Sequence, residues 1–302
     1  MNPVHRLLQA SVIGGLLLTV SVATLGQEPL FDLEATLARV GAQLERRYQR
    51  SQRIVSTEMV WVRSFTHGMR SNGPPRRLEF ERRVEWGPSE EDGVPTVTVF
   101  RELLSVNGRE PQQRDLDACL TPLAEDEDPL SALLPVRQVE FEFSLGKLEW
   151  IDGRQVARLD YVPLEEGLAE VIWDEDCVSI SLPGRSRGEA WVDVESGDVL
   201  RLDERMTRRF EFREPRDRRP RARPGWIALE RDDVSIRYQR VTFENPAETL
   251  MLPRSIERSW MIHGSGFLPH YYRFQQFSNH RRFVTDGRLV GASGTTGEPG
   301  VR

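Results

Sequence analysis

Apolar residues recur with a helical period just after residue 30. Between Leu30 and Gln52 they fall three or four positions apart, which places them on one stripe of an amphipathic helix. Asp32 precedes the stripe and has the side chain of a good helix N-cap. The residues of the stripe are Leu33, Leu37, Val40, Leu44 and Tyr48. The pattern predicts one helix with a single buried face.

Beyond residue 53 apolar residues alternate with polar ones, which is typical of strands with one buried and one solvated face. This alternation predicts a first strand over 54–66 and three long last strands over 234–243, 250–262 and 271–284. About ten or eleven strands with few helices indicate a mainly β (α+β) fold. The predicted architecture is a single curved antiparallel sheet.

Turn residues predict how some strands are joined. Asp152-Gly153 predicts a hairpin, and Pro183-Gly184 predicts a second one between strands 178–182 and 189–194. A further long strand is predicted over 199–212.

Composition fits a globular protein with a core. The chain has 302 residues, of which 38% are hydrophobic and 29% charged, so it is too apolar for an intrinsically disordered chain. Its formal net charge of −6 argues against a dedicated nucleic-acid binder, so no nucleic-acid partner is expected.

Residues 1–26 have the pattern of a secretory signal peptide: Arg6 precedes an uncharged stretch to Leu25. We expect cleavage after Gly26 or Ala23 and export to the periplasm. An uncleaved inner-membrane anchor is the alternative, because the stretch is close to the minimum length for a membrane span. The rest divides into a β domain over 27–290 and a tail over 291–302, which is expected to be disordered.

The chain has two cysteines, Cys119 and Cys177. A disulfide between them would fit an oxidising compartment and stabilise the fold by about 4 kcal/mol through loop closure. Two unpaired, buried cysteines are the alternative, because the sequence does not give the distance between them.

Motifs for chemistry are weak. Gly184–Gly188 matches Gly-x-Ser-x-Gly, but the next residues alternate as a strand, whereas a nucleophile elbow needs a helix there. His263 and His270 flank a loop without an obvious third metal ligand. We therefore expect no catalytic residue, no metal and no cofactor.

An arginine-rich insertion loop is predicted over about 205–224, where prolines interrupt regular structure. It is either a solvated loop or a contact for an anionic membrane surface or an acidic protein. The arginines that would make such a contact are Arg213, Arg216, Arg218, Arg219, Arg221 and Arg223.

Two segments carry a family resemblance. Residues 188–202, GEAWVDVESGDVLRL, and residues 241–257, with Leu252-Pro253 between two strands, resemble the LolA/LolB-like superfamily of periplasmic lipoprotein carriers, in particular its outer-membrane lipoprotein-sorting-like branch. The resemblance covers roughly residues 31–285. It implies a half-barrel that wraps the N-terminal helix and an apolar cavity that receives acyl chains. The chain departs from those carriers in its length, its arginine-rich insertion and a predicted, partly helical segment over 114–134.

The leading hypothesis is an exported, non-enzymatic binding protein that holds a lipid acyl chain or a lipoprotein in an apolar groove between sheet and helix. The alternatives are a periplasmic sensor or scaffold for a protein partner, and an exported hydrolase whose site forms only across space. The groove candidates are Leu37, Val40, Leu44, Trp61, Phe80, Trp86, Phe141, Phe143 and Trp191.

Overall fold

The computed structural model describes residues 32–282 except 51–52, 67, 90–94, 117–128, 175–176, 216–224, 245–246 and 265–269. The chain divides into the units Met1–Asp32 and Leu33–Arg302, and the structure described below is that of the second unit. The predicted signal peptide and C-terminal tail lie outside the described residues, as does Cys119. The backbone of Cys177 begins the strand Cys177–Ser181, but the position of its side chain is not described.

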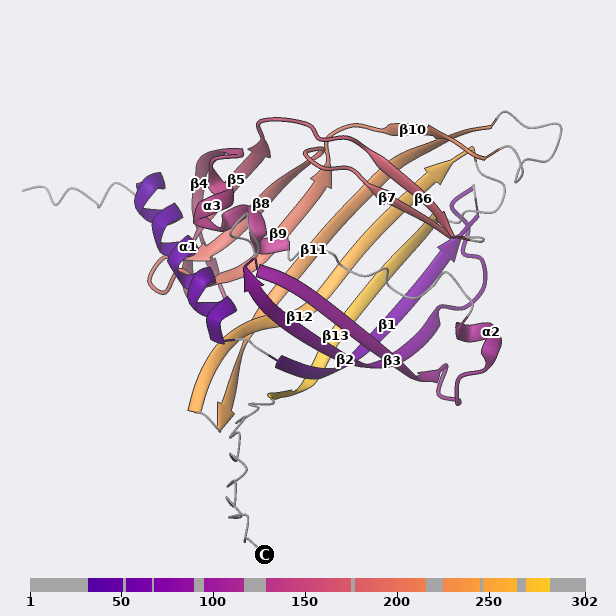
Figure 1. The fold of residues 1–302 in the computed structure, drawn as a ribbon, viewed down its shortest axis with the longest axis horizontal. Helices are drawn as coiled ribbons and strands as arrows, with labels where there is room; N and C mark the ends of the chain where they lie inside the picture. The colour runs from indigo at the N-terminus through magenta and orange to yellow at the C-terminus, as the bar shows by residue number, and fades with distance from the viewer. Residues whose placement is uncertain are drawn as a thin grey trace, which may run out of the picture. The chain divides into compact units, whose positions relative to one another are not determined.

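One large antiparallel sheet dominates the structure (Figure 1). It has eleven strands, with the order β3-β2-β1-β13-β12-β11-β9-β8-β5-β4 and with β10 paired to β11. Its strands are β1 (Arg53–Phe65), β2 (Arg76–Ser89), β3 (Pro95–Val106), β4 (Phe141–Ile151), β5 (Arg154–Pro163), β8 (Ser186–Asp193), β9 (Val199–Met206), β10 (Phe210–Arg213), β11 (Trp226–Glu244), β12 (Ala247–His263) and β13 (His270–Arg282).

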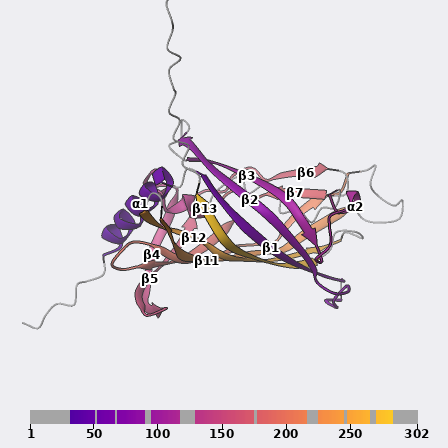
Figure 2. The same ribbon diagram turned by 90° about the horizontal axis from the view of Figure 1, so that it is seen from below.

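The sheet is curved and does not close, because β3 and β4 are its two edges. Figure 2 shows β1, β2 and β3 turning away from the plane of β11 and β12. The predicted fold class, a curved antiparallel sheet with a packed helix, is confirmed by this topology.

The alternation in β1 explains how the sheet gains an inner face. Ile54, Ser56, Glu58, Val60 and Val62 are all buried on one side of the strand. Successive strand residues point to opposite faces, so this set faces the interior while its neighbours face outward. Two of the five are polar, and that places hydrogen-bonding groups inside the curved sheet.

Helix α1 (Leu33–Arg50) covers part of the inner face. It begins directly after Asp32, and Val40, Leu44 and Tyr48 from the predicted stripe are buried in the main apolar cluster. Gly41 faces the helix α3 (Pro135–Gln138): a Cβ at Gly41 would lie 2.8 Å from Pro135 Cγ. Only glycine allows α1 and α3 to approach this closely.

The two sequence predictions about hairpins had different outcomes. The Asp152-Gly153 hairpin is confirmed as the β4–β5 turn, where both residues have positive φ. The hairpin predicted between 178–182 and 189–194 is wrong, because β7 (Cys177–Ser181) pairs with β6 (Glu170–Asp174), whereas β8 pairs with β5 and β9. The β6–β7 ribbon instead packs apolar side chains against the cluster around Leu229.

The strand predicted over 199–212 is divided in two by residues 207–209, and its second part, β10, pairs with β11. β10 lies inside the predicted arginine-rich loop, so that segment is not a loop throughout. In the described part of 114–134 the structure shows two short helices, α2 (Gln113–Leu116) and η1 (Pro129–Leu133).

Candidate functional site

A cavity of about 40 Å³ opens on the inner face of the sheet, beside the C-terminal half of α1. Seven elements contribute to its walls, which are mostly apolar: α1, β1, β2, β3, β11, β12 and β13. The apolar residues that line it are Ile54, Val84, Trp86, Val97, Val99, Ile236, Tyr238, Leu252, Pro253, Ile256 and Phe277.

Two buried arginines line this apolar cavity. Arg47 comes from α1 and has 6% of its surface exposed, and Arg82 comes from β2 with 9% exposed. The guanidinium carbon of Arg82 lies 5.2 Å from the ring centre of Phe277, and that of Arg47 lies 5.7 Å from the ring centre of Tyr238. Stacking on aromatic rings holds a guanidinium in place and offsets part of the cost of burying it.

A buried carboxylate lies beside the cavity. Glu58 on β1 is fully buried, and its carboxylate accepts hydrogen bonds from Arg101 Nε at 2.8 Å and from Gln275 Nε2 at 2.6 Å. Arg82 Nε lies 4.0 Å from the same carboxylate. Side chains from the four strands β3, β2, β1 and β13 thus meet at one polar centre. The carboxylate of Glu58 interacts with all three partners.

His280 on β13 also lines the cavity. Burial lowers the pKa of His280, and the nearby positive charge of Arg82 lowers it further. The imidazole is therefore neutral at neutral pH, and the positive charge in the cavity wall comes from the two arginines.

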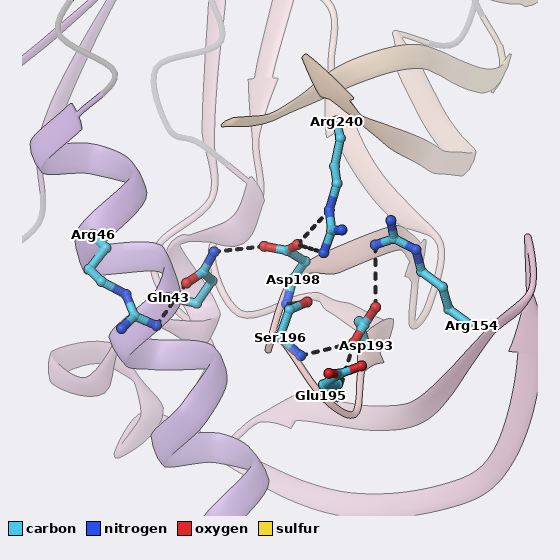
Figure 3. A network of polar contacts seen from close by, with 8 residues as sticks. All are labelled: Gln43, Arg46, Arg154, Asp193, Glu195, Ser196, Asp198 and Arg240. Atoms are coloured by element: carbon cyan, nitrogen blue, oxygen red, sulfur yellow. Dashed lines mark hydrogen bonds and ion pairs between the residues drawn. The ribbon is translucent and has the colours of Figure 1, made fainter. Parts of the chain in front are cut away.

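The turn between β8 and β9 fastens α1 to the sheet (Figure 3). Asp198, which is 5% exposed, accepts a hydrogen bond of 2.7 Å from Gln43 Nε2 on α1 and one of 2.8 Å from Arg240 on β11. Arg39 of the same helix donates to the backbone oxygen of Val194 in this turn. The side of α1 nearest the cavity is thus held by polar contacts as well as by its apolar stripe.

Asp193 shapes this turn from within. Its carboxylate accepts hydrogen bonds of 2.9 Å from the backbone N–H groups of Glu195 and Ser196, and Arg154 lies 3.3 Å away. Burial alone would raise the pKa of Asp193, but these backbone hydrogen bonds outweigh it and the pKa is lowered. The segment 188–202, which carries the family resemblance, therefore contains the turn that positions α1.

The structure distributes the predicted groove residues over several places. Trp86 lines the cavity, and Phe80 lies in a neighbouring cluster with Leu78 and Val60. Five others belong to the main apolar cluster under α1: Leu37, Val40, Leu44, Phe141 and Phe143.

Trp61 and Trp191 lie on the opposite face of the sheet. Trp61 packs against Phe274, with ring centres 5.5 Å apart. The sequence neighbours of Trp191, Ala190 and Val192, belong to the main cluster. The side chain of Trp191 itself faces the other way: its indole N–H donates to Glu149 at 3.1 Å, and its ring packs under Arg201. Because strand side chains alternate between faces, neither tryptophan reaches the cavity.

Sequence reasoning missed both arginines of the cavity, although the sequence contained a signal for each. Arg47 lies three residues after Leu44 and next to Tyr48, within the apolar stripe of the helix. Arg82 is in phase with Phe80 and Val84, the apolar positions of its strand. A charged residue at an apolar position of the pattern is a useful marker for an interior polar site.

The other sequence candidates lie away from this cavity. Arg213 is exposed at the end of β10, where its guanidinium stacks on Trp226 at 4.5 Å, and the other candidate arginines, from Arg216 to Arg223, lie outside the described residues. His263 and His270 face each other with ring centres 5.1 Å apart, and His270 Nδ1 accepts a hydrogen bond from the backbone of Ile262. Within the described ranges no group of three potential metal ligands occurs.

None of the helices in the described part of the chain is long and apolar enough to cross a membrane.

No family model and no curated protein matches the chain. Among solved structures, a DUF1329 family protein from Desulfovibrio piger ATCC 29098 is 11% identical, with 83% of this chain and 93% of that chain covered and a TM-score of 0.38. An outer membrane lipoprotein-sorting protein domain from Vibrio parahaemolyticus is 11% identical, with 83% and 93% covered and a TM-score of 0.36. A LolA superfamily protein from Nitrosomonas europaea is 10% identical, with 84% and 94% covered and a TM-score of 0.30.

The chain is similar to LolA-like proteins. One neighbour is a LolA superfamily protein and another is an outer membrane lipoprotein-sorting protein domain, which are the names that the sequence resemblance gave.

Proposed function

We propose that this chain is an exported, non-enzymatic binding protein that holds the acyl chain of a lipid or of a lipidated partner in the cavity between the sheet and α1. One observation carries the proposal: apolar side chains from the four strands β1, β11, β12 and β13 and from the edge region β2–β3 converge on a single internal space beside α1. Ligand sites are typically concave and apolar, with a few polar groups at defined positions.

The space must widen to receive a chain, because its volume of about 40 Å³ is far below the roughly 300–1,000 Å³ of ordinary ligand pockets. Two of its walls are suited to moving. β3 is an edge strand that pairs only with β2 and contributes Val97 and Val99 to the lining. α1 is held by its apolar stripe and by the Asp198 contacts rather than by the sheet ladder.

The length of the ligand's acyl chain provides the test of this proposal. Burying one methylene group is worth about 0.8 kcal/mol, which corresponds to roughly a four-fold change in affinity. Titration of the purified protein with a series of single-chain amphiphiles from eight to sixteen carbons should therefore show affinity that rises steeply with length and then levels off when the cavity is full.

A pair of tryptophan variants controls for nonspecific adsorption. Trp86→Ala removes a lining residue, whereas Trp150→Ala removes a tryptophan that is 73% exposed on the edge strand β4. We expect the first to weaken binding at least ten-fold and the second to leave it unchanged. Native mass spectrometry of protein recovered from the periplasm, followed by organic extraction, should find bound acyl material. Protein that is empty and binds no member of the series would overturn the proposal in favour of a sensor or scaffold for a protein partner.

A further inference from the structure

The cavity has a chemical preference beyond its apolar walls. We infer that its ligand is a single-chain amphiphile with a carboxylate headgroup, and that Arg47 and Arg82 bind this headgroup. The inference rests on the proposed function, since it concerns the same cavity.

The charged side chains in the described lining have one sign. Among the described residues that line the cavity, Arg47 and Arg82 are positively charged and none is acidic. Arg82 Nε lies 4.0 Å from the carboxylate of Glu58, which also accepts hydrogen bonds from Arg101 and Gln275. The charged groups among the described lining residues are therefore cationic, which favours an anionic headgroup over a neutral one.

The two arginines and Trp86 supply hydrogen-bond donors to the cavity. A guanidinium has donors only, in a planar fork that matches a carboxylate. Trp86 adds an indole N–H that is buried and has no hydrogen-bond partner among the described residues. An indole N–H is also a donor only. Donors around an apolar space suit an acceptor-only ligand such as a carboxylate.

Both arginines of the cavity are buried. With under a tenth of each residue exposed, Arg47 and Arg82 interact with an anion at low effective dielectric, where an ion pair is stronger and less screened by salt than at the surface. Arg47 lies on α1 and Arg82 on β2, so a headgroup between them would join the helix to the sheet. Binding would then reinforce the Asp198 fastening of α1.

The size of the cavity narrows the class of ligand further. A space of about 40 Å³ that widens by displacement of one edge strand or one helix favours a slim ligand with a compact headgroup. A two-chain phospholipid would need a much larger opening. A fatty carboxylate combines one chain with the smallest common anionic headgroup.

The experiment compares ligands that differ only in the headgroup. Calorimetric titrations would use palmitic acid, its methyl ester and the single-chain phosphate lysophosphatidic acid with the same palmitoyl chain. We expect the wild-type protein to bind the acid at least ten-fold more tightly than the ester, with the phosphate weaker than the acid. Arg47→Gln and Arg82→Gln should each reduce the ratio of acid to ester affinity to about one-third or less of its wild-type value, with ester affinity nearly unchanged.

Arg83→Gln is the matched control. Arg83 is the next residue along β2, is exposed and pairs with Glu81 on the outer side of the strand. This variant should keep the wild-type ratio of acid to ester affinity. If either cavity variant fails to fold, as judged by circular dichroism, the wild-type comparison of acid, ester and phosphate still decides the inference.

The outcomes separate the inference from the proposed function. Equal affinity for acid and ester would overturn the carboxylate inference while leaving acyl binding intact, and tighter binding of the phosphate would overturn the choice of headgroup. Binding of none of the three compounds would overturn the proposed function itself, and the inference with it.

Discussion

Glu58 on β1 and Arg101 on β3 are joined by a hydrogen bond of 2.8 Å that crosses the intervening strand β2. Both side chains are almost completely buried, with 0% and 5% of their surface exposed. The two residues belong to strands whose direct partner is β2, so their contact ties the outer part of the sheet together through side chains as well as through the backbone ladder.

Replacing Glu58 by Ala should destabilise the fold strongly. The change leaves the buried charge of Arg101 without this carboxylate, and breaking a buried ion pair by removing one partner costs about 3–5 kcal/mol. Urea unfolding would measure the loss. Glu102→Ala is the control, because Glu102 is the next residue to Arg101 and its side chain is 67% exposed. If both variants lost the same stability, the ion pair between Glu58 and Arg101 would not be the cause.

Replacing Asp198 by Ala should loosen α1. The variant loses the hydrogen bonds from Gln43 and Arg240, and leaving such buried partners unsatisfied costs about 1–3 kcal/mol. Amide hydrogen exchange should become faster in α1 than in β11 and β12. Glu195→Ala provides the comparison, because Glu195 is exposed in the same turn (Figure 3). Unchanged protection of α1 in the Asp198 variant would mean that the apolar stripe alone holds the helix.

Replacing Gly188 by Ala should displace Tyr161. A Cβ at Gly188 would lie 1.9 Å from Tyr161 Cζ, so the ring must move away from its position over β8. That movement would break the hydrogen bond of 2.8 Å from the Tyr161 hydroxyl to Glu204. We expect a loss of about 1–3 kcal/mol, as for other overpacked cores, measured by urea unfolding.

Gly68→Ala tests whether the loss comes from the clash, because the nearest atom to a Cβ there is 4.0 Å away. This control should leave stability nearly unchanged. A fully stable Gly188 variant would show that the Tyr161 ring is free to move.

Asp115 should make stability depend on acid pH. Hydrogen bonds from Arg109 and from the backbone of Gln112 lower its pKa from 3.8 to about 2. Since the folded-state pKa is below the unfolded value, the contribution of Asp115 is complete above about pH 4 and is lost as the pH falls through about 2. Asp115→Asn should therefore flatten the profile of unfolding free energy between about pH 4 and pH 2.

A direct carboxyl titration by nuclear magnetic resonance would measure the Asp115 midpoint, which we expect at about 2. Glu110→Gln changes an exposed carboxylate three residues before α2 and should preserve the slope of the wild-type profile. A midpoint for Asp115 near 3.8 would contradict the role of Arg109.

The disulfide between Cys119 and Cys177 stays a prediction, as do the signal peptide and the anionic contact of the arginines from Arg216 to Arg223. Each of these depends on residues outside the described ranges. The expectations about them come from residue type and order alone.

The sequence alone determined the elements and the fold class. Periods of three to four and of two depend only on which side chains must be buried, so α1 and the long strands β1, β12 and β13 were predicted to within a few residues. The β4–β5 hairpin was predictable because Asp152-Gly153 suits the positive φ values of a tight turn.

Only the tertiary structure decided which strands are neighbours and what the interior contains. β7 pairs with β6 rather than β8 because the β6–β7 ribbon buries its apolar side chains on the cluster around Leu229, which lies far away in the sequence. The arginines of the cavity come from α1 and β2 and face a common space only after the sheet has curved. Local pattern fixes which face of an element is buried, whereas a site assembled from seven elements depends on long-range pairing, and no local pattern encodes that pairing.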